Sequence, residues 1–167
     1  MLPVEPRQTH SERRNAAHAD GKSYHWKGGV GVDHFVVAYS AICAHRLVYP
    51  TKQISFISYC GNVSSHIWKS DVIHCCAEHS EYDPAQGAKV VSGPAKQPLA
   101  AIILEHNKKT DELFAVGTLG GELFNDFFSK YDFRLALEYG SNIARKPSTG
   151  DVVVTELTNF CQQQVRC

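Results

Sequence analysis

The chain has 167 residues, enough for one domain with a sizeable apolar core. Lysine plus arginine and aspartate plus glutamate both total 17, so the formal net charge is zero and offers no electrostatic basis for binding nucleic acid or an anionic membrane. No apolar run reaches the roughly 20 residues of a membrane-spanning helix, and the polar start lacks the apolar middle of a secretory signal, so we expect a soluble chain with no transmembrane segment.

The two ends of the sequence differ in composition from its middle. Residues 1–26 are rich in His, Arg, Glu, Asn and Ala without a sustained period, which predicts an extended N-terminal arm. Residues 27–140 carry the patterned segments and are interpreted as the folded domain. Residues 141–167 are interpreted as a C-terminal tail, in which residues 152–154 form either one more strand or an extended segment.

Short segments rich in β-branched and aromatic residues follow one another through the folded domain, separated by Gly, Pro, Asn and Asp. Such a series is typical of small antiparallel barrels and sandwiches. The predicted strands are residues 32–42, 54–59, 63–68, 71–74, 88–91, 99–105 and 113–117. Large apolar residues then recur at three- and four-residue steps from Leu123 to Leu137, which predicts a short C-terminal helix after an otherwise all-β domain.

Cysteine and histidine stand together twice in the sequence. Cys43 and His45 follow the first predicted strand, and Cys76 and His79 follow the strand at 71–74. A soft thiolate beside an imidazole, supplied from two separate loops, is a ligand set for a transition metal or an iron–sulfur centre. The two boxes are therefore the candidate functional site.

The residues after the second box extend this pattern. Ser80, Tyr82 and the pair Asp83-Pro84 follow it directly, and a Gly93-Pro94-Ala95 turn comes next. Together with the two boxes, they resemble the Rieske [2Fe–2S] family, in which two cysteines hold one iron and two histidines hold the other. The resemblance spans roughly residues 28–104. It implies a small antiparallel Rieske-like barrel or sandwich, with an inserted hairpin where the stretch between the boxes is longer than usual.

The resemblance also assigns roles to individual residues. Cys43 and Cys76 would bind the inner iron, while His45 and His79 would bind the outer iron. Hydrogen bonds from a serine and a tyrosine stabilise the reduced cluster in the family, and Ser80 and Tyr82 occupy that neighbourhood. Gly93 and Pro94 correspond to the loop that covers one side of the cluster.

The second box leaves its register open by one residue. Alignment of Ser80, Tyr82 and Asp83 with the family places Cys75 at the cysteine and Glu78 at the histidine. A carboxylate is a poor ligand in a soft cluster site, which favours Cys76 and His79. In the other register the site would bind a different metal or none. The cysteine pair that ties the two loops together in the family has no counterpart after His45.

The function implied by the resemblance is one-electron transfer through a [2Fe–2S] cluster. The chain would be a subunit of a membrane-associated respiratory or oxidoreductase complex, like arsenite-oxidase small subunits and the Rieske subunits of quinol–cytochrome complexes, with a quinol or molybdoenzyme donor and a cytochrome-type acceptor. It would lie on the periplasmic or membrane-associated face of that complex. No P-loop, GxSxG or HExxH motif points to a free-standing catalyst.

Two alternatives remain from the sequence. Cys43, His45, Cys76 and His79 also form a Cys₂His₂ set, which satisfies tetrahedral Zn²⁺ in a structural module. A Rieske-shaped subunit without any cluster is the other alternative.

Overall fold

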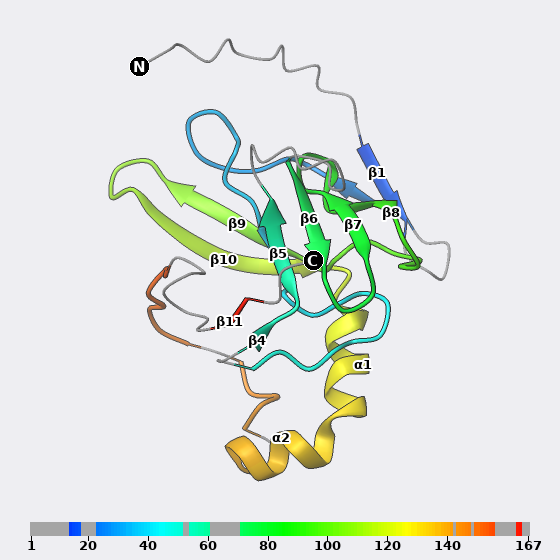
Figure 1. Ribbon diagram of the computed structural model, residues 1–167. Coiled ribbons are helices and arrows are strands. Elements are labelled where there is room, and N and C mark those ends of the chain that lie inside the picture. The colour runs from blue at the N-terminus through cyan, green and yellow to red at the C-terminus, as the bar shows by residue number, and fades with distance from the viewer. Residues whose placement is uncertain are drawn as a thin grey trace.

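The computed structural model describes residues 14–17, 23–51, 54–60, 71–141, 143–147, 149–155 and 163–164. Within them the protein is mostly β-sheet with two short helices, which confirms the predicted all-β fold class (Figure 1). The strands are β1 (Arg14–Ala17), β2 (Ser23–Trp26), β3 (Ala38–Tyr39), β4 (Ile54–Ser55), β5 (Ile57–Cys60), β6 (Val72–Cys75), β7 (Ser80–Asp83), β8 (Lys89–Ser92), β9 (Ala101–Asn107), β10 (Glu112–Leu119) and β11 (Gln163–Gln164). The helices are α1 (Glu122–Lys130) and α2 (Asp132–Tyr139), and a 3₁₀ turn, η1, covers Pro84–Gln86.

A four-stranded antiparallel sheet in the order β5-β6-β7-β8 carries the second cysteine box. All four residues of β6 are buried, as expected for a strand inside a sheet. The β6–β7 pairing sets Cys75 opposite Ser80, so residues 76–79 form the tip of this hairpin. The hairpin thus presents the second box at one end of the sheet.

A three-stranded antiparallel sheet in the order β10-β9-β3 leads to the first box. β3 pairs with the start of β9, and the N–H of Ser40 donates to the carbonyl of Ala100 at 2.8 Å just beyond that pairing. Cys43 follows three residues later. The core contains residues from both sheets and from α1, including Cys43, Cys75, Tyr82, Leu99 and Leu123. Both cysteines therefore belong to the packed interior.

The helices follow β10 and lie at the bottom of the view in Figure 1, below the two larger sheets. Leu123 and Phe127 of α1 and Leu135 of α2 are buried, which accounts for the apolar spacing seen in the sequence. The predicted single helix is divided at Tyr131. None of the helices among the described residues has the length and apolar character needed to cross a bilayer.

Several segments differ from the strand predictions. The stretch 32–42 contains only β3 and an isolated bridge between Val30 and Val36, because Gly31 and His34 have φ of +93° and +54° and turn the chain between them. β7 was not predicted as a strand. The sequence of β7 mixes polar and charged residues, and only pairing with β6 buries Glu81 beside His74.

The ends of the chain add further differences. In the N-terminal segment, expected to be an extended arm, β1 and β2 pair antiparallel. Residues 151–155 form no strand, so this part of the tail follows the extended alternative. The predicted strand at 63–68 lies outside the described residues. β5, expected to pair with that strand in an inserted hairpin, pairs with β6.

Candidate metal centre

The two boxes meet at a pair of buried thiols. Cys43 and Cys75 are 1% and 0% exposed, both are free cysteines, and their side chains hydrogen-bond to each other. One thiol comes from the loop after β3 and the other from the end of β6. The fold therefore brings together one cysteine from each box.

Each sulfur also lies against the backbone of its own loop. The N–H groups of His45 and Arg46 donate toward Cys43, and those of Ala77 and Glu78 donate toward Cys75. The hydrogen bond from Cys75 lowers the pKa of the Cys43 thiol to about 6, assisted by these backbone donors and opposed by burial. The same hydrogen bond, followed by burial, raises the pKa of Cys75. The pair thus favours one thiolate.

Cys76 does not take part in this pair. It is disulfide-bonded, and its Sγ lies 3.7 Å from the Oγ of Ser58 on β5. A sulfur in a disulfide is not a thiolate ligand. The structure thus joins Cys43 to Cys75, the cysteine of the register that the sequence left open, and not to Cys76. Metal binding by any of these cysteines stays a prediction.

His45 and Glu78 form a second pair next to the thiols. The Nδ1 of His45 lies 3.5 Å from Oε2 of Glu78, and Nε of Arg46 lies 3.4 Å from Oε1 of the same carboxylate. The side chains of His45 and Glu78 are both 26% exposed. The Nδ1 atom itself is buried and makes no hydrogen bond in the described part of the chain. The outer end of the site is thus partly open to solvent.

His79 occupies a backbone position with unusual geometry. Its φ is +56°, in the left-handed region, its N–H donates to the carbonyl of Cys75 at 2.7 Å, and the residue is exposed. The first loop has a similar turn at Leu47, whose φ is +52° and whose N–H donates to the carbonyl of Cys43 at 2.9 Å. His79 and Leu47 therefore close the two turns through their backbones.

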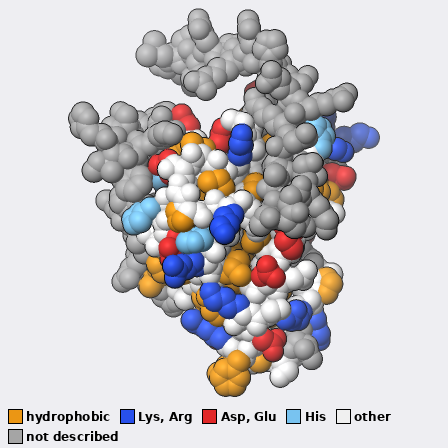
Figure 2. All heavy atoms as spheres, turned by 90° about the vertical axis from the view of Figure 1, so that its right-hand side faces the viewer, with side chains coloured by type: hydrophobic (Ala, Val, Ile, Leu, Met, Phe, Trp, Pro, Cys, Tyr) orange, Lys and Arg blue, Asp and Glu red, His pale blue; other side chains and the backbone are white. Residues whose placement is uncertain are grey.

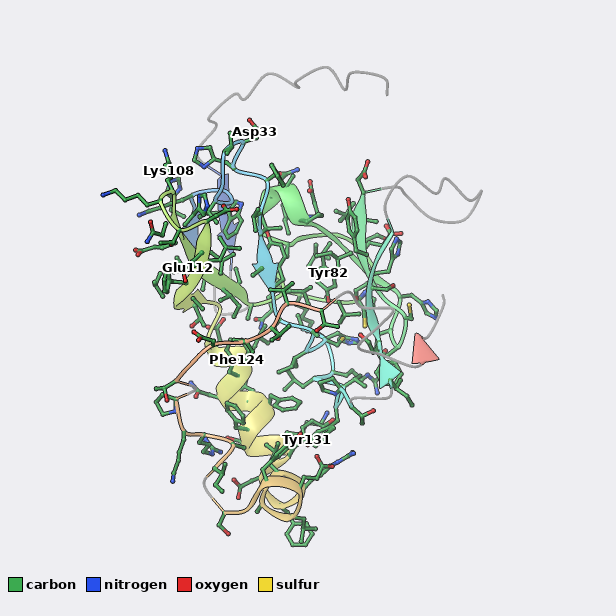
Figure 3. All side chains as sticks on the ribbon, turned by 90° about the vertical axis from the view of Figure 1, so that its left-hand side faces the viewer. Asp33, Tyr82, Lys108, Glu112, Phe124 and Tyr131 are labelled. Atoms are coloured by element: carbon green, nitrogen blue, oxygen red, sulfur yellow. The ribbon has the colours of Figure 1, made fainter. Side chains whose placement is uncertain are left out.

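Ser80 and Tyr82 lie on β7, directly after the second loop, and their contact with a cluster stays a prediction. Both are fully buried, and Figure 3 shows Tyr82 inside the molecule. The N–H of Ala95 donates to Oγ of Ser80 at 3.2 Å, and the Ser80 side chain also lies close enough to the Tyr82 hydroxyl to oppose in part the rise in the pKa of Tyr82 that burial causes. The Tyr82 hydroxyl has no hydrogen-bond partner among the described residues. Burial, and then the negative charge of Cys43 and Cys75, raises the pKa of Tyr82.

The turn that begins at Gly93 lies directly over the second loop. Gly93 has φ of +91°, and a Cβ at this position would lie 2.5 Å from the carbonyl oxygen of His79 and 2.6 Å from Cα of Ser80. Only glycine tolerates both the dihedral angle and this approach. Pro94 is exposed and Ala95 is buried. The turn therefore packs against the hairpin tip, and contact of Gly93 or Pro94 with a cluster stays a prediction.

The first loop is held by the helices. The Tyr49 ring contacts Phe127 and Tyr131, with centroids 5.5 and 4.9 Å away, and its hydroxyl donates to Glu138. Nζ of Lys130 donates to the carbonyl of Arg46 at 2.5 Å. The sequence indicated a packed helix face but gave no local signal that its partner is Tyr49.

The first loop has no cysteine after His45 that could form the pair that ties the two loops together in the Rieske family. Val48 in the first loop and Ala77 in the second both pack against the buried core cluster. Apolar packing and the helix contacts of Tyr49 therefore stabilise this region.

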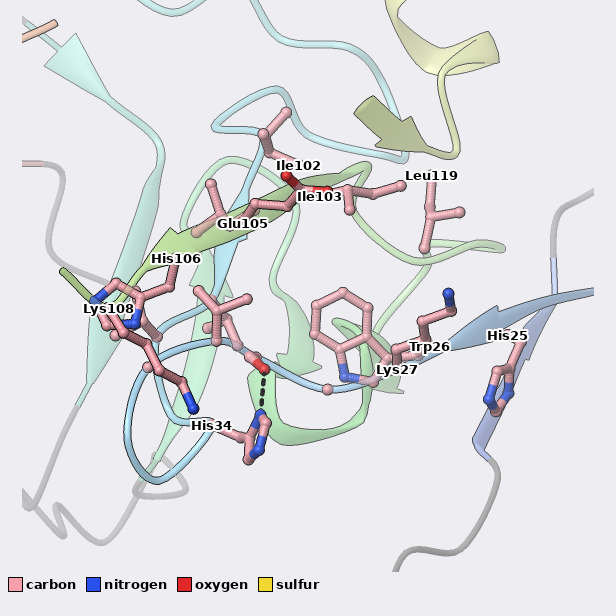
Figure 4. A pocket seen from close by; sticks show the side chains of 17 residues that line it. His25, Trp26, Lys27, His34, Ile102, Ile103, Glu105, His106, Lys108 and Leu119 are labelled. Atoms are coloured by element: carbon pink, nitrogen blue, oxygen red, sulfur yellow. Dashed lines mark hydrogen bonds between the residues drawn. The ribbon is translucent and has the colours of Figure 1, made fainter. Parts of the chain in front are cut away.

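Two cavities among the described residues lie away from these pairs. One of about 740 Å³ is bordered by Trp26, His34, Ile103 and His106, whose side chains surround it in Figure 4. A second of about 940 Å³ adjoins the same 28–37 segment. Neither is lined by Cys43, nor by any other residue of the two pairs described above. The candidate centre is thus a buried contact between loops.

No model of a known protein family matches the chain. Among solved structures, the chain is similar to the soluble domain of the Rieske protein II (soxF) from Sulfolobus acidocaldarius, with 33% sequence identity and a TM-score of 0.41. The match covers 54% of this chain and 44% of that chain. This chain therefore matches less than half the length of that protein.

Proposed function

We propose that this chain carries single electrons through a [2Fe–2S] cluster held between the loop after β3 and the β6–β7 hairpin. Cys43 and Cys75 would hold the inner iron, and His45 would bind the outer iron through Nδ1. The fourth ligand would come from the second loop, where Glu78 and His79 are the candidates. The observation that carries the proposal is the pair of buried free thiols from separate loops.

Two orphaned polar atoms beside the thiols fit such a group. The hydroxyl of Tyr82 and Nδ1 of His45 are buried without hydrogen bonds in the described part of the structure. Buried polar groups are expensive when unpaired, so each calls for a partner. A cluster sulfur accepts a hydrogen bond from a hydroxyl, and iron accepts a lone pair from neutral imidazole. The residues present therefore fit a histidine- and cysteine-ligated cluster.

We propose a two-iron centre and not a single ion, because the candidate ligands lie in two pairs. Tetrahedral zinc needs four ligands around one point. Within the described residues, no three Cys, His, Asp or Glu side chains gather around a common point. A [2Fe–2S] cluster needs only two protein ligands on each iron. Separate Cys43/Cys75 and His45/Glu78 pairs suit the second requirement better than the first.

When bound, the cluster supplies a one-electron couple that mixed ligation raises well above the roughly −400 mV of all-cysteine plant-type ferredoxins. The chain's own residues set its surroundings. The buried Tyr82 and Ser80 would donate hydrogen bonds to the cluster, and the burial of both thiols would exclude water from the inner side. The partly exposed His45 leaves the outer side accessible to a partner.

The partners in this proposal are other subunits of a membrane-associated redox complex, including a cytochrome-type acceptor. The chain would lie on the periplasmic or membrane-associated face of that complex.

A cluster-free structural subunit is the second candidate, and one observation favours it. The Glu78 carboxylate lies 3.5 Å from Nδ1 of His45 and 3.4 Å from Nε of Arg46, so these side chains link the two loops directly. Such a subunit would be colourless after anaerobic purification and would contain neither iron nor acid-labile sulfide. Those two analyses separate it from the electron carrier.

The adjacent cysteines provide a matched test of the proposal. We expect Cys75→Ser to lose at least tenfold in bound iron and sulfide, because it removes a thiolate of the inner pair. Cys76→Ser should retain both, although loss of its disulfide costs about 2–5 kcal/mol of stability. Iron and sulfide per chain are measured after anaerobic reconstitution, and thermal unfolding checks that both variants fold. Equal retention by both variants, or loss only in Cys76→Ser, would contradict the proposed site.

A further inference from the structure

We infer that Glu78, and not His79, is the fourth ligand, so that the outer iron is held by one imidazole and one carboxylate. This inference rests on the proposed function and specifies its site. It departs from the ligand pair first expected from the sequence, and three features of the second loop support it.

The first feature is the backbone of the hairpin tip. Cys75 pairs with Ser80 across the hairpin, and the N–H groups of both Glu78 and His79 donate to the carbonyl of Cys75. His79 has φ of +56°, and Gly93 packs against its carbonyl. His79 thus occupies a turn position whose geometry suits glycine, and its backbone shapes the turn. Glu78 precedes this turn and is in position to present its side chain to the first loop.

The second feature is the placement of the carboxylate. Oε2 of Glu78 lies 3.5 Å from Nδ1 of His45, whose ring nitrogen is buried and without a hydrogen bond in the described residues. Both side chains have the same 26% exposure, whereas His79 is classed as exposed. The carboxylate therefore already lies beside the imidazole expected to share the outer iron with it. A centre between them would replace this direct contact.

The third feature is charge. A carboxylate adds a negative charge that a neutral imidazole lacks, and Arg46 lies 3.4 Å from the Glu78 oxygen that does not face His45. Iron sites in proteins accept mixed imidazole and carboxylate ligation, as non-haem iron triads do. Added negative charge on the ligands stabilises the oxidised state, and net charge is a determinant of cluster potential. We therefore expect a lower potential than that of the same chain with histidine at position 78.

The test compares two neighbouring residues in the full chain. Glu78→Gln keeps the size of the side chain but removes the anionic ligand, and His79→Ala removes the competing imidazole. We expect Glu78→Gln to lower bound iron and sulfide at least tenfold, while His79→Ala keeps the content and the electron paramagnetic resonance spectrum of the unsubstituted chain. Glu78→His should keep the cluster and shift its potential upward. Circular dichroism establishes that each variant is folded.

The outcomes separate the two proposals. A cluster that survives Glu78→Gln but disappears in His79→Ala overturns the assignment of Glu78 and leaves the electron carrier intact. Cluster binding by Glu78→His but not by the unsubstituted chain also overturns the assignment, because the carboxylate then prevents binding. If neither the unsubstituted chain nor Glu78→His binds iron and sulfide, the proposed function itself fails.

Discussion

Tyr82 shows how one residue connects the core to the candidate centre. Its ring is fully buried, and its hydroxyl lies beside the two thiols without a hydrogen bond in the described structure. A phenol that donates to a cluster sulfur stabilises the more negative, reduced state. Tyr82 is thus placed to raise the reduction potential of a bound cluster.

Removal of that hydroxyl gives a direct prediction. Tyr82→Phe should keep the cluster and the fold but lower its reduction potential, because the reduced state loses a donor. A loss of about 1.4 kcal/mol corresponds to roughly 60 mV for a one-electron couple. Protein-film voltammetry measures the change, with Tyr59→Phe, whose hydroxyl meets Asp71 at the surface, as the control. An unchanged potential in Tyr82→Phe would show that the hydroxyl does not reach the cluster.

The residue scale also shows why the sequence could not choose the second ligand pair. Cys75 and Cys76 are adjacent, so either one satisfies a motif with tolerance of a single position. The choice depends on strand register, because β6 ends at Cys75 and pairs it with Ser80. The alignment of Ser80 and Tyr82 points to Cys75, whereas the preference of the cluster for soft ligands points to Cys76 and His79. Which of these residues bind a metal stays a prediction.

At the scale of elements, the helix pair acts as a support for the first loop. Phe127 is 6% exposed and contacts Tyr49, and Lys130 donates to the loop backbone at Arg46. The guanidinium of Arg134 lies 3.8 Å from the centre of the Tyr49 ring. Packing thus positions the segment that contains Cys43 and His45.

This support predicts a local effect of a helix substitution. Phe127→Ala should destabilise the protein by about 3–5 kcal/mol and should increase the alkylation rate of Cys43 in the metal-free chain more than tenfold, because the first loop opens more often. Phe133→Ala on α2 is the matched control, since Phe133 is 79% exposed. Mass spectrometry after timed alkylation reports Cys43. Equal rates in the two variants would show that α1 does not hold the loop.

Strand prediction succeeded where burial alternates or is continuous, as in β9 and β6. It failed at residues 32–37, where the left-handed residue His34, together with Gly31 just before the segment, turns the chain, and at β7, whose buried Glu81 lies beside His74 of β6. Helical spacing in the sequence was correct, but the break at Tyr131 had no proline or glycine to mark it. Local sequence patterns therefore predicted which segments form strands and helices, whereas strand pairing and packing determined where those elements begin and end.

At the scale of the whole molecule, two antiparallel sheets deliver the two loops to one buried contact. The first sheet ends in the loop with Cys43, and the second ends in the hairpin with Cys75. Acidic and basic side chains are interspersed on the face shown in Figure 2, in agreement with the zero net charge. Recognition of a redox partner would then depend on the partly exposed His45 end more than on a single strongly charged surface.

The central claim is that Cys43, Cys75 and His45, with one oxygen or nitrogen ligand from the second loop, hold a [2Fe–2S] cluster. Electron paramagnetic resonance of the anaerobically reconstituted and dithionite-reduced chain tests it most directly. We predict a spin-one-half signal whose average g value is lower than that of all-cysteine clusters, and which disappears in Cys75→Ser. A reconstituted chain that folds but gives no signal and contains no sulfide would contradict the account.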